Sequence, residues 1–211
     1  MFIRKIKNKL IYLFTSYFII VFSFFLLGVS TFYYINAENY RLKLKEKNVS
    51  FFKNGQLVKI SKIIDGDELQ VQADNEKNTV IRLLGIKSFK PGNDFLFPDF
   101  GKKCMKFMNT NALNRKARIE IGKTKTDSKK RILARLLVFN QNSGKYDRDV
   151  ATQLLSRGLT IVYTKYPFSR IREYLQVENL ARKNKLGIWG NKHSIDVAIA
   201  LKKKWLKEQI K

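Results

Sequence analysis

An uncharged run from Leu10 to Ile35, dense in Phe, Leu, Ile and Tyr, constrains this chain more than any other feature. It is long enough to cross a bilayer with some tilt. We predict a basic tail over residues 1–9 and an uncleaved transmembrane anchor over residues 10–36. A cleaved signal peptide is the alternative. The run is longer than a signal-peptide core, and Ile35 is too large for a small-x-small site ending at Ala37.

The residues after this span, 37–50, read as a charged tether to a soluble domain. Both flanks of the span are basic, so the positive-inside rule discriminates weakly between orientations. Because only a short tail precedes the span, we expect a single-pass membrane protein. Its soluble domain would lie on the non-cytoplasmic side.

The chain carries 42 Lys and Arg against 17 Asp and Glu, a formal net charge of +25. Most of this excess belongs to the residues that follow the span and its tether. Such a surface is expected to attract polyanions by counterion release, with nucleic acid or an anionic membrane as the partner. A Lys-rich composition that serves solubility alone is the simpler interpretation. Lone Cys104 and His193 exclude a disulfide and a Cys/His metal cluster, and we expect Cys104 in the core and His193 on the surface.

Alternating apolar residues predict five strands, and helical spacing predicts three helices among and after them. The strands are expected over residues 57–64, 69–73, 80–86, 117–122 and 132–139, and the helices over 102–114, 149–156 and 169–185. This order fits an α+β fold, a five-stranded OB-type barrel with about three helices, preceded by the transmembrane helix. Residues 192–211 read as a basic amphipathic helix that packs on the barrel or lies on an anionic membrane or nucleic acid.

An acidic turn, Asp65-Gly66-Asp67, and two separated arginines, Arg82 and Arg131, suit a site that cleaves phosphodiesters. A carboxylate binds a metal, and guanidinium groups match phosphate geometry. Six motifs in order then resemble the staphylococcal nuclease (thermonuclease-like) domain over about residues 55 to 190, and we assign residues 51–191 to it. They are Asp65-Gly66-Asp67, Arg82 to Ile86, Phe100 to Cys104, Asp127 to Ala134, Leu155 to Leu159, and Glu178 to Trp189.

The resemblance implies a calcium-dependent hydrolase. In that family the second aspartate of the turn and an aspartate after the Arg-bearing strand hold calcium, and a glutamate three residues further on is the general base. Asp67 is similar to the first metal ligand, with Asp65 as its supporting acid. Arg82 and Arg131 are similar to the two phosphate-binding arginines, and Asp127 to a loop acid with a structural role near Arg131. Lys87 and Lys90 stand where the second aspartate and the glutamate are expected.

These two lysines invert the chemistry of the site. An ammonium group offers three donors and no acceptor, so it repels a metal and a protonated amine accepts no proton from water. We therefore expect a weakened or inactive nuclease fold that binds nucleic acid or another polyanion through Arg82, Lys87, Lys90 and Arg131, a mainly cationic cradle. Aromatic rings at Tyr163, Tyr166 and Phe168 would add stacking or belong to the core.

The alternative is an active, divergent metal-dependent endonuclease acting on DNA or RNA. It would need another acid to rebuild the calcium site, and the candidates are Asp94, Asp99 and Glu68. Asp94 and Asp99 read as solvated loop acids, and Glu68 alternates to the opposite face of its strand from Asp67. A scaffold that organises a membrane is a third interpretation.

Overall fold

A computed structural model describes residues 2–49, 52–73, 78–89 and 98–210. The chain forms two compact units, Met1–Asn48 and Val49–Lys211. The first consists of one helix, α1 (Phe2–Val49), in which Phe14–Asn39 is long and apolar enough to cross a membrane. The helix continues through the segment expected to be a tether. This segment lacks Pro and Gly and is rich in Leu, Lys, Arg and Glu, which favour helix.

The second unit is built on a six-stranded sheet, with the order β3-β2-β1-β5-β6-β7 among the described residues. Adjacent strands are antiparallel, and β3 also pairs in parallel with β6. The β3–β6 pairing joins five strands into a closed circuit and leaves β7 outside it. The strands are β1 (Leu57–Asp65), β2 (Glu68–Gln72), β3 (Thr79–Leu83), β5 (Lys116–Thr126), β6 (Ile132–Asn140) and β7 (Lys145–Asp149).

The predicted α+β class is confirmed, but five strands were too few. The strand expected over 80–86 is divided at Gly85, whose φ of +82° favours glycine. A Cβ there would also lie 2.4 Å from the Phe168 ring. Beyond this turn, β4 (Ile86–Lys87) pairs with β8 (Ile161–Val162) in a small second sheet. The edge strand β7 was missed because its sequence, Lys-Tyr-Asp-Arg-Asp, has no aliphatic residue to alternate.

All of the expected helices are present. They are α2 (Pro98–Asn111), α3 (Val150–Ser156), α4 (Ile171–Lys183) and α5 (Lys192–Ile210), with a short 3₁₀ helix, η1 (Gly187–Gly190), before α5. Asp149 caps α3, because its side chain accepts a hydrogen bond from the backbone N–H of Ala151. The helix expected over 169–185 begins two residues later, and its N-cap residue, Arg170, makes no side-chain capping bond.

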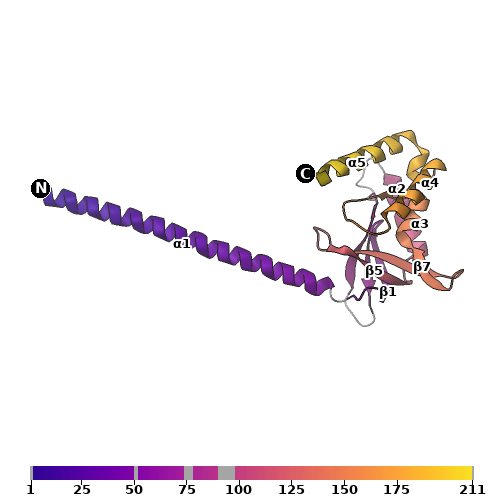
Figure 1. Ribbon diagram of the computed structural model, residues 1–211, viewed down its shortest axis with the longest axis horizontal. Helices are drawn as coiled ribbons and strands as arrows, with labels where there is room; N and C mark the ends of the chain where they lie inside the picture. The colour runs from indigo at the N-terminus through magenta and orange to yellow at the C-terminus, as the bar shows by residue number, and fades with distance from the viewer. Residues whose placement is uncertain (1, 50–51, 74–77, 90–97, 211) are drawn as a thin grey trace. The chain divides into compact units, whose positions relative to one another are not determined.

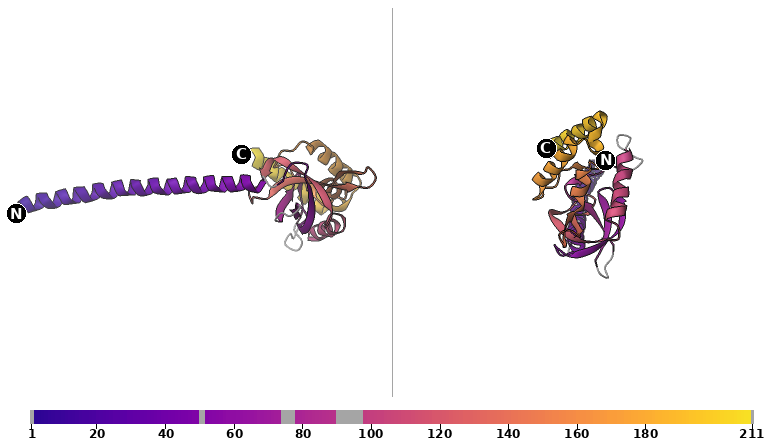
Figure 2. Two further views of the ribbon diagram at one scale, coloured as in Figure 1. Left: turned by 90° about the horizontal axis from the view of Figure 1, so that it is seen from below. Right: turned by 90° about the vertical axis from the view of Figure 1, so that its right-hand side faces the viewer.

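The apolar faces of these elements form two clusters of buried residues. The larger fills the interior between the sheet, α2 and α3, and includes Cys104, as predicted. The smaller lies under α5 and contains Trp189 and Ala198. Figure 1 shows α3, α4 and α5 beyond one end of the strands. Figure 2 shows α2 on one side of the sheet and α4 with α5 on the other. The C-terminal helix therefore packs on the folded unit.

Candidate functional site

The acidic turn between β1 and β2 is buried. Asp65 is 7% exposed and Asp67 only 1%. The Asp65 Oδ1 atom accepts hydrogen bonds from the backbone N–H of Gly66 at 2.6 Å and from the Ser88 hydroxyl at 3.4 Å. A Cβ at Gly66 would lie 2.7 Å from the Ser88 Cβ and 2.6 Å from the Cys104 Sγ. Only glycine therefore lets the turn approach Ser88 and α2 this closely.

The Asp67 carboxylate receives three donors on one oxygen. Its Oδ2 atom lies 3.5 Å from Arg82 Nη2, 3.4 Å from Lys87 Nζ and 3.2 Å from the backbone nitrogen of Ser88. Pairing of β2 with β3 sets Arg82 opposite Glu68, the residue after Asp67. The turn at Gly85 then brings β4, and with it Lys87, to the same carboxylate. An ammonium group thus contacts the acid expected to hold a metal.

A second group of charges is organised by the loop between β5 and β6. The Asp127 Oδ1 atom accepts hydrogen bonds from the backbone N–H groups of Lys129 and Arg131, each at 3.0 Å. The Arg131 Nε atom donates to Asp127 Oδ2 at 2.8 Å, and its Nη1 atom donates to Glu68. Burial opposes ionisation of Asp127, but its hydrogen bonds with Arg131 hold the pKa below its usual value.

Arg82 joins the two groups. Besides contacting Asp67, its Nη1 atom lies 3.7 Å from Asp127 Oδ2. The guanidinium also lies over the ring of Tyr163, with Cζ 5.3 Å from the centroid, a cation–π contact. Burial raises the pKa of the Tyr163 hydroxyl, an effect that the charge of Arg82 partly opposes. Trp205 of α5 then packs edge-on against Tyr163, with centroids 4.7 Å apart.

Among the residues that the structure describes, the charges of this cluster nearly cancel. The described cations Arg82, Lys87 and Arg131 are all paired with acids, because Asp127 and Glu68 converge on Arg131 and Asp67 on the other two. Asp65 adds a further carboxylate. The Cys104 thiol lies in the same place, and burial and the two turn aspartates raise its pKa. It stays protonated, in keeping with its prediction as a core residue.

These residues do not suit calcium, the ion that the family resemblance implies. Calcium needs several oxygen ligands converging on one point. In the part of the chain that the structure describes, no group of three or more His, Cys, Asp or Glu side chains is arranged to hold a metal. The Asp67 Oδ2 atom, the expected first ligand, instead faces two cationic side chains and a backbone N–H.

The sequence predicted most members of this cluster, since Asp65, Asp67, Arg82, Lys87 and Arg131 come together. Lys90 and Asp94 lie outside the described residues. Asp99 is exposed in the first turn of α2.

Three contacts were not foreseen. Glu68 was expected to face away from Asp67, yet it pairs with Arg131, because β2 carries it to the strand edge reached from the β5–β6 loop. Ser88 binds both turn aspartates, and Trp205 reaches Tyr163. The contact of Ser88 could have been expected, because Ser88 directly follows Lys87. Nothing in the sequence pairs Trp205 with Tyr163.

Comparison with known proteins gives two findings. Residues 80–191, more than half of the chain, match the family described as staphylococcal nuclease homologue. A relative named "Probable endonuclease LCL3", from Komagataella phaffii, is 30% identical over 95 residues, which are 43% of this chain and 40% of the relative. The chain therefore spans about two fifths of that relative's length. The family match confirms the resemblance drawn from the motifs and agrees with an OB-type α+β fold.

Proposed function

We propose, on the premise that the chain belongs to the staphylococcal nuclease homologue family, that it is a nucleic-acid-binding module of nuclease fold with weakened or lost catalysis. One observation carries this proposal, the contact of 3.4 Å between Lys87 Nζ and Asp67 Oδ2. A positive charge held there repels a divalent cation by on the order of a few kcal/mol at an intermediate effective dielectric. It also binds the carboxylate that a metal would use.

Phosphate binding remains within the chemistry of the site. Arg131 donates to Glu68 at the rim, and the Glu68 side chain is 23% exposed, so a phosphate oxygen competes with it from solvent. Lys87 is 32% exposed and offers further donors. A guanidinium presents paired donors that match a phosphate. Arg131 and Lys87 are thus the groups that a backbone phosphate reaches first.

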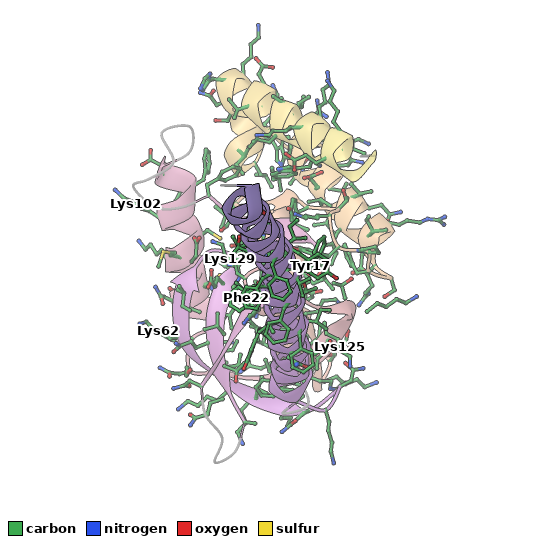
Figure 3. All side chains as sticks on the ribbon, turned by 90° about the vertical axis from the view of Figure 1, so that its left-hand side faces the viewer. Tyr17, Phe22, Lys62, Lys102, Lys125 and Lys129 are labelled. Atoms are coloured by element: carbon green, nitrogen blue, oxygen red, sulfur yellow. The ribbon has the colours of Figure 1, made fainter. Side chains whose placement is uncertain are left out.

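The surface around the site supports attraction of a polyanion. The end of the β5–β6 hairpin next to Arg131 carries exposed lysines, namely Lys123, Lys125, Lys129 and Lys130. The only acid within this stretch, Asp127, is buried and already paired with Arg131. Figure 3 labels two of these lysines, Lys125 and Lys129. These lysines supply a salt-dependent attraction that does not depend on sequence.

We further propose that α1 anchors the protein in a membrane as a single span, with the folded unit on the non-cytoplasmic side. The support is the apolar stretch Phe14–Asn39, which has a mean hydropathy of 2.1. A signal sequence passes the same test of length and composition. Mass spectrometry of the N-terminal peptide from the membrane fraction separates the two. An uncleaved anchor gives a peptide that begins at Met1, whereas a cleaved signal sequence gives one that begins after the span.

An active endonuclease is the second candidate, and two observations favour it. The relative from Komagataella phaffii carries the name of an endonuclease. Asp67, Arg82 and Arg131 are also retained and lie in one cluster. Under this alternative, acids outside the described residues, such as Asp94, would complete a metal site.

Incubation of the full-length chain, in non-ionic detergent, with single-stranded DNA and RNA tests the two candidates. We expect salt-sensitive binding and no cleavage above background, with calcium or with a chelator. Arg131→Gln should weaken binding by about tenfold, which corresponds to the loss of one charge-assisted hydrogen bond. The control is Arg172→Gln on the exposed surface of α4, which should bind like the wild type.

Calcium-dependent cleavage that disappears in Asp67→Ala would reject the binding-module proposal and establish the endonuclease. Binding that is insensitive to salt would count against nucleic acid as a ligand. The thermal unfolding of each variant is recorded alongside, because Asp67 is buried and Arg131 is partly buried and paired with two acids.

A further inference from the structure

The structure points to a second part of the nucleic-acid surface, which we infer to be the lysine face of α5, formed by Lys203, Lys204 and Lys207. This inference rests on the proposed function, because it extends the binding surface beyond the site. All three side chains are exposed. A shallow groove on the helix is lined by Ala200, the three lysines and Glu208. Three ammonium groups against one carboxylate give this face a net positive charge.

The fixed position of α5 beside the site gives this charge a role. Trp205 packs against the Tyr163 ring, and the Arg82 guanidinium lies over that same ring. The Trp205 ring centroid is therefore no more than about 10 Å from the Arg82 guanidinium. Lys204 adjoins Trp205 in sequence, so the lysine face begins within a short distance of Arg82, which contacts the same Asp67 carboxylate as Lys87.

A second connection holds α5 at the strands that carry Lys87. Lys202 forms an ion pair with Glu178 of α4. The other oxygen of Glu178, Oε1, accepts a hydrogen bond from the backbone N–H of Val162 at 2.7 Å. Val162 lies in β8, the partner strand of β4 and Lys87. The helix is thus tied to the site through a salt bridge and a strand as well as through Trp205.

The packing of α5 favours nucleic acid over insertion into lipid. A helix that lies in a membrane interface buries its apolar face among the acyl chains. In α5 that face is already used, because Ala198 is fully buried and Val197, Leu201 and Trp205 pack with it against Trp189 and its neighbours. The lysine face remains outside together with Leu206, a single exposed leucine, and the row of lysines suits a row of phosphates. Residues 80–191 carry the family match, so this surface lies beyond it.

The chain offers a matched control for this inference. Lys102, Lys103 and Lys106 of α2 are also exposed and have the same spacing as the three lysines of α5. Lys102 extends outward in Figure 3, and α2 lies on the other side of the sheet from α5 in Figure 2. The triple substitutions K203Q/K204Q/K207Q and K102Q/K103Q/K106Q remove equal charge from two helices in different places.

Binding of a fluorescent oligothymidylate to the full-length chain in non-ionic detergent is measured by anisotropy across a salt series. Each phosphate contact on a single strand contributes about 0.7 to the slope of log K against log salt. We expect the α5 triple variant to reduce this slope by about 2 and the α2 triple variant to leave it unchanged. Circular dichroism melting checks that both variants are folded.

Three results would overturn the inference. Equal loss in both triple variants would mean that only total charge matters. An unchanged slope in the α5 variant, with normal wild-type binding, would remove α5 from the surface and leave the proposed function standing. Loss of binding to phosphatidylserine vesicles, with oligothymidylate binding intact, would assign the lysine face to a membrane. Wild-type chain that fails to bind oligothymidylate would instead overturn the proposed function itself.

Discussion

The Arg131 side of the site and the Asp67 side hold their charges in different ways. Around Arg131, the Asp127 carboxylate accepts two backbone N–H bonds at 3.0 Å and a guanidinium bond at 2.8 Å. Around Asp67, the nearest donors lie at 3.2 to 3.5 Å from one oxygen. The first arrangement is a set of well-formed hydrogen bonds, whereas the second is a loose convergence of cations on a single acceptor.

The difference separates residues kept for structure from residues kept for chemistry. Asp127 and Arg131 shape the β5–β6 loop and pair with Glu68 of β2, so they have a structural role in the fold. Asp67 lies in a turn whose expected metal partner has become Lys87. Retention of the arginines is therefore weak evidence of catalysis in this chain. The Asp67 side is where activity and inactivity are distinguished.

The largest expected effect is a difference in stability between two variants, each of which removes one carboxylate charge, on the Arg131 side or on the Asp67 side. Asp127→Asn removes one of the two carboxylates paired with Arg131, and breaking a buried ion pair costs about 3 to 5 kcal/mol of stability. Asp67→Asn should cost about 1 kcal/mol, because its contacts are longer and Lys87 can turn to solvent. Urea unfolding of both variants gives the two free energies of unfolding. Equal costs would erase the distinction between the two sides.

A gain of metal affinity would sharpen the comparison. In Lys87→Asp a carboxylate replaces the ammonium next to Asp67, which removes repulsion and adds an oxygen ligand. We expect calcium affinity to rise by roughly 100-fold, measured by calorimetry, as the reversal of a repulsion of a few kcal/mol. The control is Lys129→Asp, which makes the same charge change on the exposed β5–β6 loop. An equal gain in the control would show that bulk charge, rather than the Asp67 side, governs metal binding.

Much of the fold could be predicted because its signals are local. Alternation in Val58 and Ile60 marked β1, and Asp149 marked the beginning of α3. The missed features depend on distant neighbours. Gly85 divides the run expected as one strand over 80–86, and Phe168 packs where a side chain at this position would stand. The continuation of α1 to Val49 was missed because charge was read as flexibility, although the residues there favour helix.

The site was predicted as a set of residues but not as a set of pairs. Motif order placed Asp67, Arg82 and Arg131 together, and Lys87 was identified as the departure from the family. The family resemblance placed Asp127 near Arg131, but the sequence contains no signal that Glu68 also pairs with Arg131, because this contact is set by the register of β2 against the β5–β6 loop. The described cations of the site are therefore each paired with an acid, while Lys90 lies outside the described residues. A count of cations at a site predicts its charge only when the acids that reach it are also known.

The smallest expected effect is in the pH dependence of stability, and it should come from the Arg131 side. Arg131 holds the pKa of Asp127 below the ordinary value of 3.8, so the unfolded chain takes up this proton at a higher pH than the folded one. The contribution of Asp127 is therefore fully present above about pH 4 and declines as pH falls through its folded pKa.

Other carboxylates also titrate in this range, so the informative quantity is the difference between wild type and Asp127→Asn. Urea unfolding at a series of pH values should give two curves that converge on acidification, because the wild type alone loses the stabilisation that Asp127 provides. Curves that stay parallel would mean that the ion pair persists unchanged or adds no stability. The close hydrogen bonds of the Arg131 side would then not be a source of pH-dependent stability.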